Sequence, residues 1–160
     1  MDQKNEFHII KDLASTKFHK NIPLYQSDIP DYLSKFSGRP YGGQCWFLDD
    51  SCDLIDSEFF NRHSSYVHFK MKGQEFVIFG VYMPFYNNKH KNESVALYET
   101  TLSILIAHMK IFKDKNIPIF IIGDFNADPF RPTCQKSSNL NKLDKILCNF
   151  IHDNDLVLID

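Results

Sequence analysis

The feature that most constrains this 160-residue chain is an uninterrupted apolar run that ends abruptly in polar residues. Residues 119–122 are all apolar, and residues 123–126 read Gly-Asp-Phe-Asn. A continuous apolar run of this kind is typical of a β-strand buried on both faces. Because side chains alternate along a strand, Asp124 and Asn126 point to one side, and Phe125 to the other, if the chain stays extended. The sequence therefore predicts a carboxylate and a carboxamide side by side at the edge of a core.

An acid and an amide placed together at a strand end can do complementary chemistry. The carboxylate of Asp124 can orient or deprotonate a water or bind a metal ion, and the amide of Asn126 can donate to an oxyanion. Gly, Asp and Asn also favour turns, so a turn after a strand explains the same residues without any chemistry. Tyr82 ends a second apolar run, and if the two strands are neighbours, Tyr82, Asp124 and Asn126 converge on one rim. A tyrosine that caps the core is the alternative for Tyr82.

Composition sets the broad class of protein. The length predicts one domain with a sizeable core, and the contents of 43% hydrophobic and 24% charged residues are ordinary for a globular protein. The net charge is −2, from 18 basic and 20 acidic residues. This balance excludes a broadly cationic nucleic-acid coat, but it leaves room for local binding of a phosphate backbone.

The sequence contains no sign of secretion or membrane insertion. The N-terminal residues lack an apolar signal region, and no apolar run approaches the length needed to span a membrane. The four cysteines have no C-x-x-C spacing, which favours a reduced intracellular state. We therefore expect a nuclear or cytoplasmic protein that is not secreted and has no membrane partner. The cysteines are Cys45, Cys52, Cys134 and Cys148.

The periodicity of the remaining sequence predicts alternating strands and helices. Apolar residues three or four apart indicate amphipathic helices, and short apolar runs next to Gly or Pro indicate strands. This order favours an α/β protein with a mixed sheet, in which the strand at 75–83 is central because it is apolar on both faces. The polar stretch 1–37 predicts at most one short helix. The other expected elements are a strand at 44–48, a hairpin of strands at 65–71 and 75–83, a helix at 92–115, a strand at 117–122, a helix at 140–152 and a buried strand at 156–159.

The order of these motifs resembles that of a known superfamily. Residues 123–128 (Gly-Asp-Phe-Asn-Ala-Asp), preceded by residues 80–84 (Gly-Val-Tyr-Met-Pro) and a helix between them, resemble the endonuclease/exonuclease/phosphatase superfamily. That superfamily includes the pancreatic DNase and the apurinic-site endonucleases. Residues 38–43 (Gly-Arg-Pro-Tyr-Gly-Gly) are similar to a segment of the apurinic-type endonuclease domains of LINE-type non-LTR retrotransposons. The resemblance covers about residues 35–160 of a single domain.

The resemblance implies a fold, an activity and a set of residue roles. The fold is a four-layer α/β sandwich, in which two mixed β-sheets are flanked by helices, and the activity is Mg²⁺-dependent hydrolysis of DNA phosphodiester bonds at one rim. Asp124 would activate the attacking water and is a candidate metal ligand, Asn126 would hold the scissile phosphate, and Tyr82 would contact it through its hydroxyl. Asp128 is expected to brace the loop.

Other polar residues are secondary candidates. Arg39 and Arg62 are weaker candidates for substrate binding, because a guanidinium can bind phosphate through two parallel hydrogen bonds. No histidine has a metal-ligand spacing such as H-x-x-x-H, so none of the seven is favoured as catalytic. The acids Asp49, Asp50 and Asp53 predict a solvated turn, with metal binding as the alternative.

Two parts of the superfamily pattern are missing from the sequence. The family begins with a strand that carries an asparagine and a strand that ends in a metal-binding glutamate, and neither precedes Gly38. Its final Ser-Asp-His element would lie beyond Asp160. Because Mg²⁺ requires several hard oxygen ligands, the sequence predicts a partial domain, truncated at both ends, with impaired or absent activity. A phosphatase of the same superfamily that acts on a small phosphoester, and a non-catalytic remnant that binds nucleic acid or protein, remain as alternatives.

Overall fold

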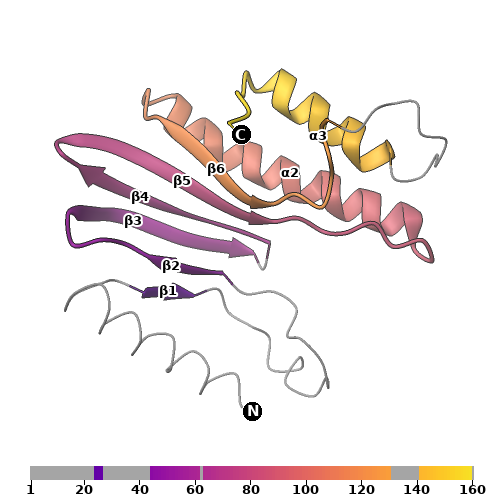
Figure 1. Cartoon of the computed structure of the whole chain (residues 1–160), viewed down its shortest axis with the longest axis horizontal. Helices are drawn as coiled ribbons and strands as arrows, with labels where there is room; N and C mark the ends of the chain where they lie inside the picture. The colour runs from indigo at the N-terminus through magenta and orange to yellow at the C-terminus, as the bar shows by residue number, and fades with distance from the viewer. Residues whose placement is uncertain (1–23, 27–43, 62, 131–140, 160) are drawn as a thin grey trace, which may run out of the picture.

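The computed structural model of the chain describes residues 24–26, 44–61, 63–130 and 141–159 (Figure 1). These residues form both strands and helices, with a helix between the last two strands, so the expected α/β class is confirmed. Within residues 1–43 only 24–26 are described, so the short helix considered within 1–37 and the segment 38–43 lie outside the described residues. In chain order the elements are β1 (Leu24–Gln26), β2 (Cys45–Phe47), β3 (Cys52–Asn61), β4 (Ser64–Met71), β5 (Gln74–Tyr82), α2 (Lys91–Lys113), β6 (Ile119–Asp124) and α3 (Asn141–Asp153).

The main sheet has four strands in the order β3-β4-β5-β6. Its first three strands are antiparallel, and β6 is parallel to β5, so the sheet is mixed as expected. The β4–β5 hairpin turns at Lys72 and Gly73, whose φ angles of 50° and 83° are both left-handed. A two-residue hairpin turn of this hand matches the twist of its strands. The predicted hairpin and the central place of β5 are confirmed.

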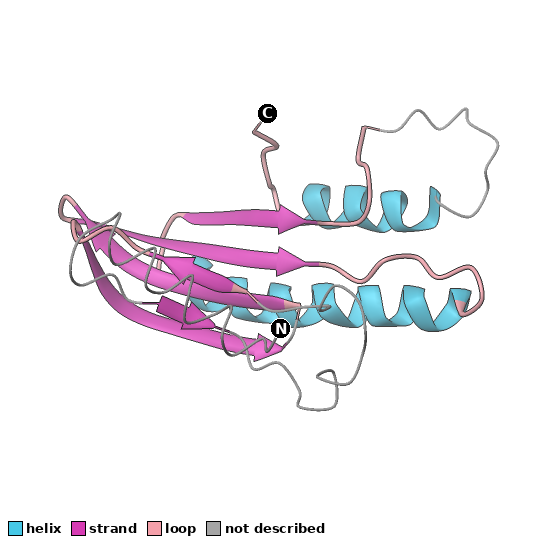
Figure 2. Cartoon of the chain, turned by 60° about the horizontal axis from the view of Figure 1, so that its bottom comes forward, coloured by secondary structure: helices cyan, strands magenta, loops and turns pink. Residues whose placement is uncertain are grey.

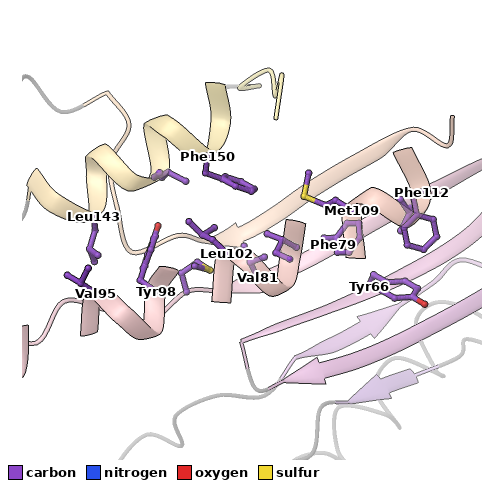
Figure 3. Close-up of a cluster of buried hydrophobic side chains, with 14 residues drawn as sticks. Tyr66, Phe79, Val81, Val95, Tyr98, Leu102, Met109, Phe112, Leu143 and Phe150 are labelled. Carbon is purple, nitrogen blue, oxygen red and sulfur yellow. The ribbon is translucent and has the colours of Figure 1, made fainter. Parts of the chain in front are cut away.

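One face of this sheet is covered by the two helices. α2 connects the parallel strands β5 and β6, which a tight turn cannot join, and α3 packs beside it (Figures 1 and 2). Alternate residues of β5 point into the resulting core, where Val77 and Phe79 are fully buried. Figure 3 shows Phe79 and Val81 in this core. The buried helix residues of this core are Val95, Tyr98, Leu102, Leu105, Met109 and Phe112 of α2 and Leu143, Leu147 and Phe150 of α3. Both helices lie close to the ranges that the sequence predicted.

The opposite face of the sheet has a smaller cover. Leu48 and Trp46 pack against Val67 of β4, as part of a second apolar cluster. On β6, however, the side chains of Phe120 and Ile122 are 42% and 52% exposed. The prediction that this strand is buried on both faces is therefore wrong for the described residues, because β6 has only β5 as a neighbour among them and nothing described covers its outer face.

Two further strand predictions differ from the structure. β3 was not predicted because its sequence includes Asp53, Asp56 and Glu58, which interrupt the apolar pattern of an edge strand. Conversely, residues 156–159 form no strand, and Val157 and Ile159 are more than four-fifths exposed. Beside the four-stranded sheet the described residues contain only the two-stranded pairing of β1 with β2, so they do not show the four-layer sandwich.

The long helix α2 differs from the expectation that no segment is long and apolar enough to span a membrane. By length and hydropathy alone, α2 could cross one. Six of its apolar residues, spaced three or four apart from Val95 to Phe112, instead face the sheet and α3 in the core described above, while Leu97, Ile106 and Ile111 are exposed. Core helices of globular proteins meet the same criteria of length and composition.

Candidate functional site

Tyr82 and Asp124 meet at one end of the sheet. They are the last residues of β5 and β6, and the parallel register pairs them directly. The strands are thus neighbours, as the interpretation of the two strand ends required. Tyr82 is 38% exposed and does not cap the core, and Asp124 is exposed as well. Both side chains therefore lie where a ligand at the carboxyl ends of parallel strands can reach them.

The loop after β6 departs from an extended strand. Gly123 has a φ of 139°, and a Cβ at this position would overlap the carbonyl oxygen of Val81 on β5. Asn126 has a left-handed φ of 48°, and its backbone N–H donates to Oδ1 of Asp124 at 2.8 Å. The expected alternation of side chains does not extend to Asn126, because the chain turns there. The turn and the cluster of polar side chains thus occur together.

The carboxamide of Asn126 joins this loop to β5. Its Nδ2 donates to the carbonyl oxygen of Met83 at 2.7 Å, and the N–H of Met83 donates to the carbonyl oxygen of Asp124 at 2.8 Å. The chain that follows Tyr82 and the chain that follows Asp124 are therefore held together. A carboxamide nitrogen carries two hydrogens, so Asn126 keeps a second N–H that can donate to an anion.

A buried residue of α2 holds the loop that follows β6. The hydroxyl of Tyr98, fully buried on α2, donates to the carbonyl oxygen of Phe125 at 3.0 Å. Burial raises the pKa of Tyr98 above its ordinary value, and the carboxylates of Asp144 and Asp124 raise it further. The phenol is therefore neutral and remains a donor throughout the physiological pH range.

Asp128 and Asp144 connect the loop to α3. Oδ1 of Asp144 accepts the N–H of Asp128 at 2.8 Å, and Oδ1 of Asp128 accepts the N–H of Phe130 at 2.9 Å. This arrangement agrees with the bracing role expected for Asp128. Asp144 was not predicted, although an acid near the start of an amphipathic helix is a sequence signal for a residue that binds backbone N–H groups.

The backbone of Tyr82 also makes hydrogen bonds with His63, a histidine that was not predicted to belong to the site. The N–H of Tyr82 donates to the carbonyl oxygen of His63 at 2.7 Å, and Nδ1 of His63 lies 2.8 Å from the carbonyl oxygen of Tyr82. The side chain of Asn61 accepts the N–H of His63 at 2.7 Å. No pattern in the sequence indicated this contact, because it depends on the register between β4 and β5.

The structure does not place the other predicted arginines and acids in the site. Arg39 and Arg62 both lie outside the described residues. Asp49 and Asp50 lie in a turn, as predicted, where Oδ1 of Asp49 accepts the N–H of Ser51 at 2.9 Å. Asp53, expected in the same turn, belongs to the edge strand β3.

The rim provides few ligands for the metal that the resemblance implies. Asp124 is the only one of the predicted site residues in the described part of the chain with a carboxylate at the rim, and one of its oxygens accepts the N–H of Asn126. Within the described ranges, no group of three or more His, Cys, Asp or Glu residues could hold a metal ion. Because Mg²⁺ is bound by several hard oxygen atoms in octahedral geometry, these residues do not fit a complete Mg²⁺ site.

Known proteins resemble this chain in structure rather than in sequence. No family model matches the sequence, and no curated protein matches it. The catalytic domain of human Nocturnin, solved with a bound sulfate anion, is 18% identical with a TM-score of 0.58, over 88% of this chain and 55% of that one. An endonuclease/exonuclease/phosphatase family protein from Bacteroides thetaiotaomicron is 20% identical with a TM-score of 0.50, over 84% of this chain and 50% of that one.

These similarities establish the fold at a coarse level. The chain has a mixed α/β fold similar to that of these two structures, one of which is an endonuclease/exonuclease/phosphatase family protein. The chain spans about half the length of the solved structures that it matches. Neither structure bears on the LINE-type subfamily.

Proposed function

We propose that this chain is part of a hydrolase domain that binds a phosphodiester of DNA at the rim formed by Tyr82, Asp124 and Asn126. The observation that supports this proposal most directly is the parallel register that pairs Tyr82 with Asp124. The turn at Asn126 adds a carboxamide at the same strand ends. An acid, an amide and a phenol at one rim are the side chains that the superfamily resemblance assigns to phosphate chemistry.

Each side chain has a role that its position permits. The exposed hydroxyl of Tyr82 can donate to a phosphate oxygen, and the second N–H of Asn126 can donate to the oxyanion that develops during attack. The carboxylate of Asp124 can accept a proton from an attacking water. If the whole enzyme uses Mg²⁺, as the resemblance implies, the metal would supply charge neutralisation, and Asp124 is the described residue that would contribute to its binding.

The activity of the chain by itself is expected to be low. Among the three rim residues only Asp124 is charged, and its negative charge opposes the approach of a phosphate. DNA is the proposed substrate because of the similarity of residues 38–43 to the LINE-type endonuclease domains. We propose the same partner for the intact domain, in the nucleus or the cytoplasm.

The test is nicking of supercoiled plasmid by the purified protein, with Mg²⁺ and with EDTA, over long incubations because the expected activity is low. Asp124→Asn preserves the size of the side chain and its acceptor for the N–H of Asn126, but it removes the negative charge. Asp114→Asn, an exposed position just after α2, is the matched control. Nicking that requires both Mg²⁺ and Asp124, and survives Asp114→Asn, would support the proposal. Nicking that survives Asp124→Asn would come from a contaminant or another site and would contradict it.

A small phosphoester is the second candidate substrate. The Bacteroides structure carries a family name that includes phosphatases, and the rim of this chain has no described element that selects DNA. Turnover of bis(p-nitrophenyl) phosphate and of p-nitrophenyl phosphate, measured beside plasmid nicking, separates the two classes. Hydrolysis of the monoester alone, lost in Asp124→Asn, would favour a phosphatase.

A further inference from the structure

A chain of side-chain hydrogen bonds lies beside the rim, and its centre is Gln44. This residue immediately precedes β2 and follows the Gly-Gly pair of the 38–43 segment. Its Nε2 lies 3.1 Å from the carbonyl oxygen of His63 and 3.1 Å from that of Gly80. Its Oε1 accepts the hydroxyl hydrogen of Ser65. The side chain of Gln44 thus connects its own segment with the start of β4 and with β5, near the Tyr82 end of the sheet.

Neighbouring residues hold Gln44 in this position. Ser65 is fully buried on β4, and its hydroxyl oxygen accepts the indole N–H of Trp46 at 2.8 Å. The indole of Trp46 lies over Gly80, where an added Cβ would be 2.6 Å from its Cζ2 atom. Gly80 is also the cross-strand partner of Ser65. The tight packing of Trp46 on Gly80 therefore fixes the segment from which Gln44 reaches the sheet.

The network continues from Gln44 to Tyr82 through one residue. The carbonyl oxygen of His63, which accepts from Gln44, also accepts the N–H of Tyr82 at 2.7 Å. A carbonyl oxygen has two lone pairs and can accept both bonds. Nδ1 of His63 completes the contact with the carbonyl oxygen of Tyr82 at 2.8 Å. Both main-chain polar groups of Tyr82 are therefore bound to a residue that Gln44 itself holds.

We propose that Gln44 is a positioning residue for Tyr82, which keeps the backbone of this strand end fixed so that the phenol faces a bound phosphate. This inference rests on the proposed function of the rim. Strand ends fray, and a ring that is more than one-third exposed has little packing of its own. Fixing the peptide on both sides of such a ring reduces the entropy lost when it binds a ligand. Glutamine suits the position because its amide offers two N–H donors and one acceptor.

Gln44→Glu tests the positioning directly. The carboxylate keeps an acceptor for Ser65 but faces the carbonyl oxygens of His63 and Gly80 without a hydrogen to donate. Gln74→Glu makes the same chemical change at the far, exposed end of β5 and is the matched control. The measurement is amide hydrogen exchange by NMR, with the amides of Tyr82, of Met83, which donates to Asp124, and of Leu105 in the core compared.

We expect exchange at Tyr82 to become about tenfold faster in Gln44→Glu, while Met83, Leu105 and the Gln74→Glu protein stay unchanged. Unchanged exchange at Tyr82 would overturn the proposal. An equal acceleration at all three amides would also overturn it, because Gln44 would then support the whole fold rather than this strand end.

A double-mutant cycle tests whether the effect reaches the ligand through Tyr82. The probe is a short fluorescein-labelled DNA duplex in EDTA, titrated with the wild type, Gln44→Glu, Tyr82→Phe and the double variant. We expect Gln44→Glu to weaken binding about tenfold, and this loss to disappear in the Tyr82→Phe background, because residues that act together are not additive. Equal losses in both backgrounds would overturn the proposal. A wild type that binds no DNA would refute the proposed function of the rim, whereas the exchange measurement would still decide whether Gln44 positions Tyr82.

Discussion

The two faces of the four-stranded sheet use similar residues in different surroundings. On the helix-covered face, Val77 and Phe79 of β5 are fully buried against α2. On the other face of β6, Phe120 and Ile122 are 42% and 52% exposed. The difference shows that an apolar side chain on a strand is buried only where another element covers it, so the composition of a strand does not determine its burial.

The two edges of the sheet differ in a related way. β3 has Asp56 and Glu58 and two register shifts against β4, which are features that keep edge strands from pairing with other chains. In β6, residues 119–122 carry no charge, and its pairing with β5 is regular. β6 has the sequence of an interior strand although its second edge has no neighbour among the described residues.

The largest expected effect tests the contrast between the faces with one substitution on each. Phe79→Ala leaves a cavity between the sheet and α2, where the ring contacts Tyr66 and Phe112, and should lower the free energy of unfolding by about 3–5 kcal/mol. Phe120→Ala removes a half-exposed ring beside Phe76 and should cost less than about 1 kcal/mol. Urea denaturation followed by circular dichroism measures both. Equal losses for the two variants would mean that the outer face is covered in solution.

A smaller effect is expected where β6 leaves the sheet. Gly123→Ala places a Cβ against the carbonyl oxygen of Val81 at a φ of 139°, which favours glycine. The strain should lower the free energy of unfolding by about 1–3 kcal/mol, and it should displace Asp124 relative to Tyr82. Gly73→Ala, at a positive φ but with no atom within 4 Å of the added Cβ, is the control for the backbone strain of a positive φ without a steric overlap. A loss no greater than that of Gly73→Ala would exclude the steric contact with β5.

The hydrogen bond from Tyr98 in the core to the loop after β6 should contribute still less to the free energy of unfolding. Tyr98→Phe leaves the carbonyl oxygen of Phe125 without its donor and should cost about 1 kcal/mol at neutral pH. The raised pKa of Tyr98 favours the neutral phenol in the folded state. Its contribution to stability is therefore complete below about pH 10, the unfolded value, and is lost as the pH rises above it. The free energy of unfolding, measured at neutral and alkaline pH, should therefore decrease less between these pH values for Tyr98→Phe than for the wild type. An equal decrease in the two proteins would contradict this assignment.

The sequence was sufficient where local pattern determines structure. The helix periodicity predicted α2 and α3, and the short spacing between two apolar runs, at residues 72–74, predicted the β4–β5 hairpin. The same reasoning placed Tyr82 and Asp124 each at the end of an apolar strand. These features depend on residues close together in the chain, whose propensities and spacing can be compared directly.

The remaining features depend on distant partners. Whether Ile122 is buried depends on what covers β6, and the apolar residues after Asp155 look like a strand until their exposure is known. The contacts of Gln44 with His63 and Gly80 follow from strand register, which no single segment specifies. His63 could not be distinguished from the other histidines by spacing alone.

The smallest expected change in stability gives the sharpest test of the comparison, because it uses two adjacent residues of one strand. Ile122→Lys places a charge on the exposed face of β6 and should change the free energy of unfolding by less than about 0.5 kcal/mol. Ile121→Lys directs the same side chain towards the helix-covered core, with which Ile121 packs, and should destabilise the fold by several times more. If the edge of β6 pairs with a second copy in solution, Ile122→Lys should reduce that association in sedimentation velocity runs, since a charge on an apolar edge strand opposes such pairing. If Ile122→Lys unfolds the protein as readily as Ile121→Lys, both faces of β6 are buried in solution, and the contrast between them is lost.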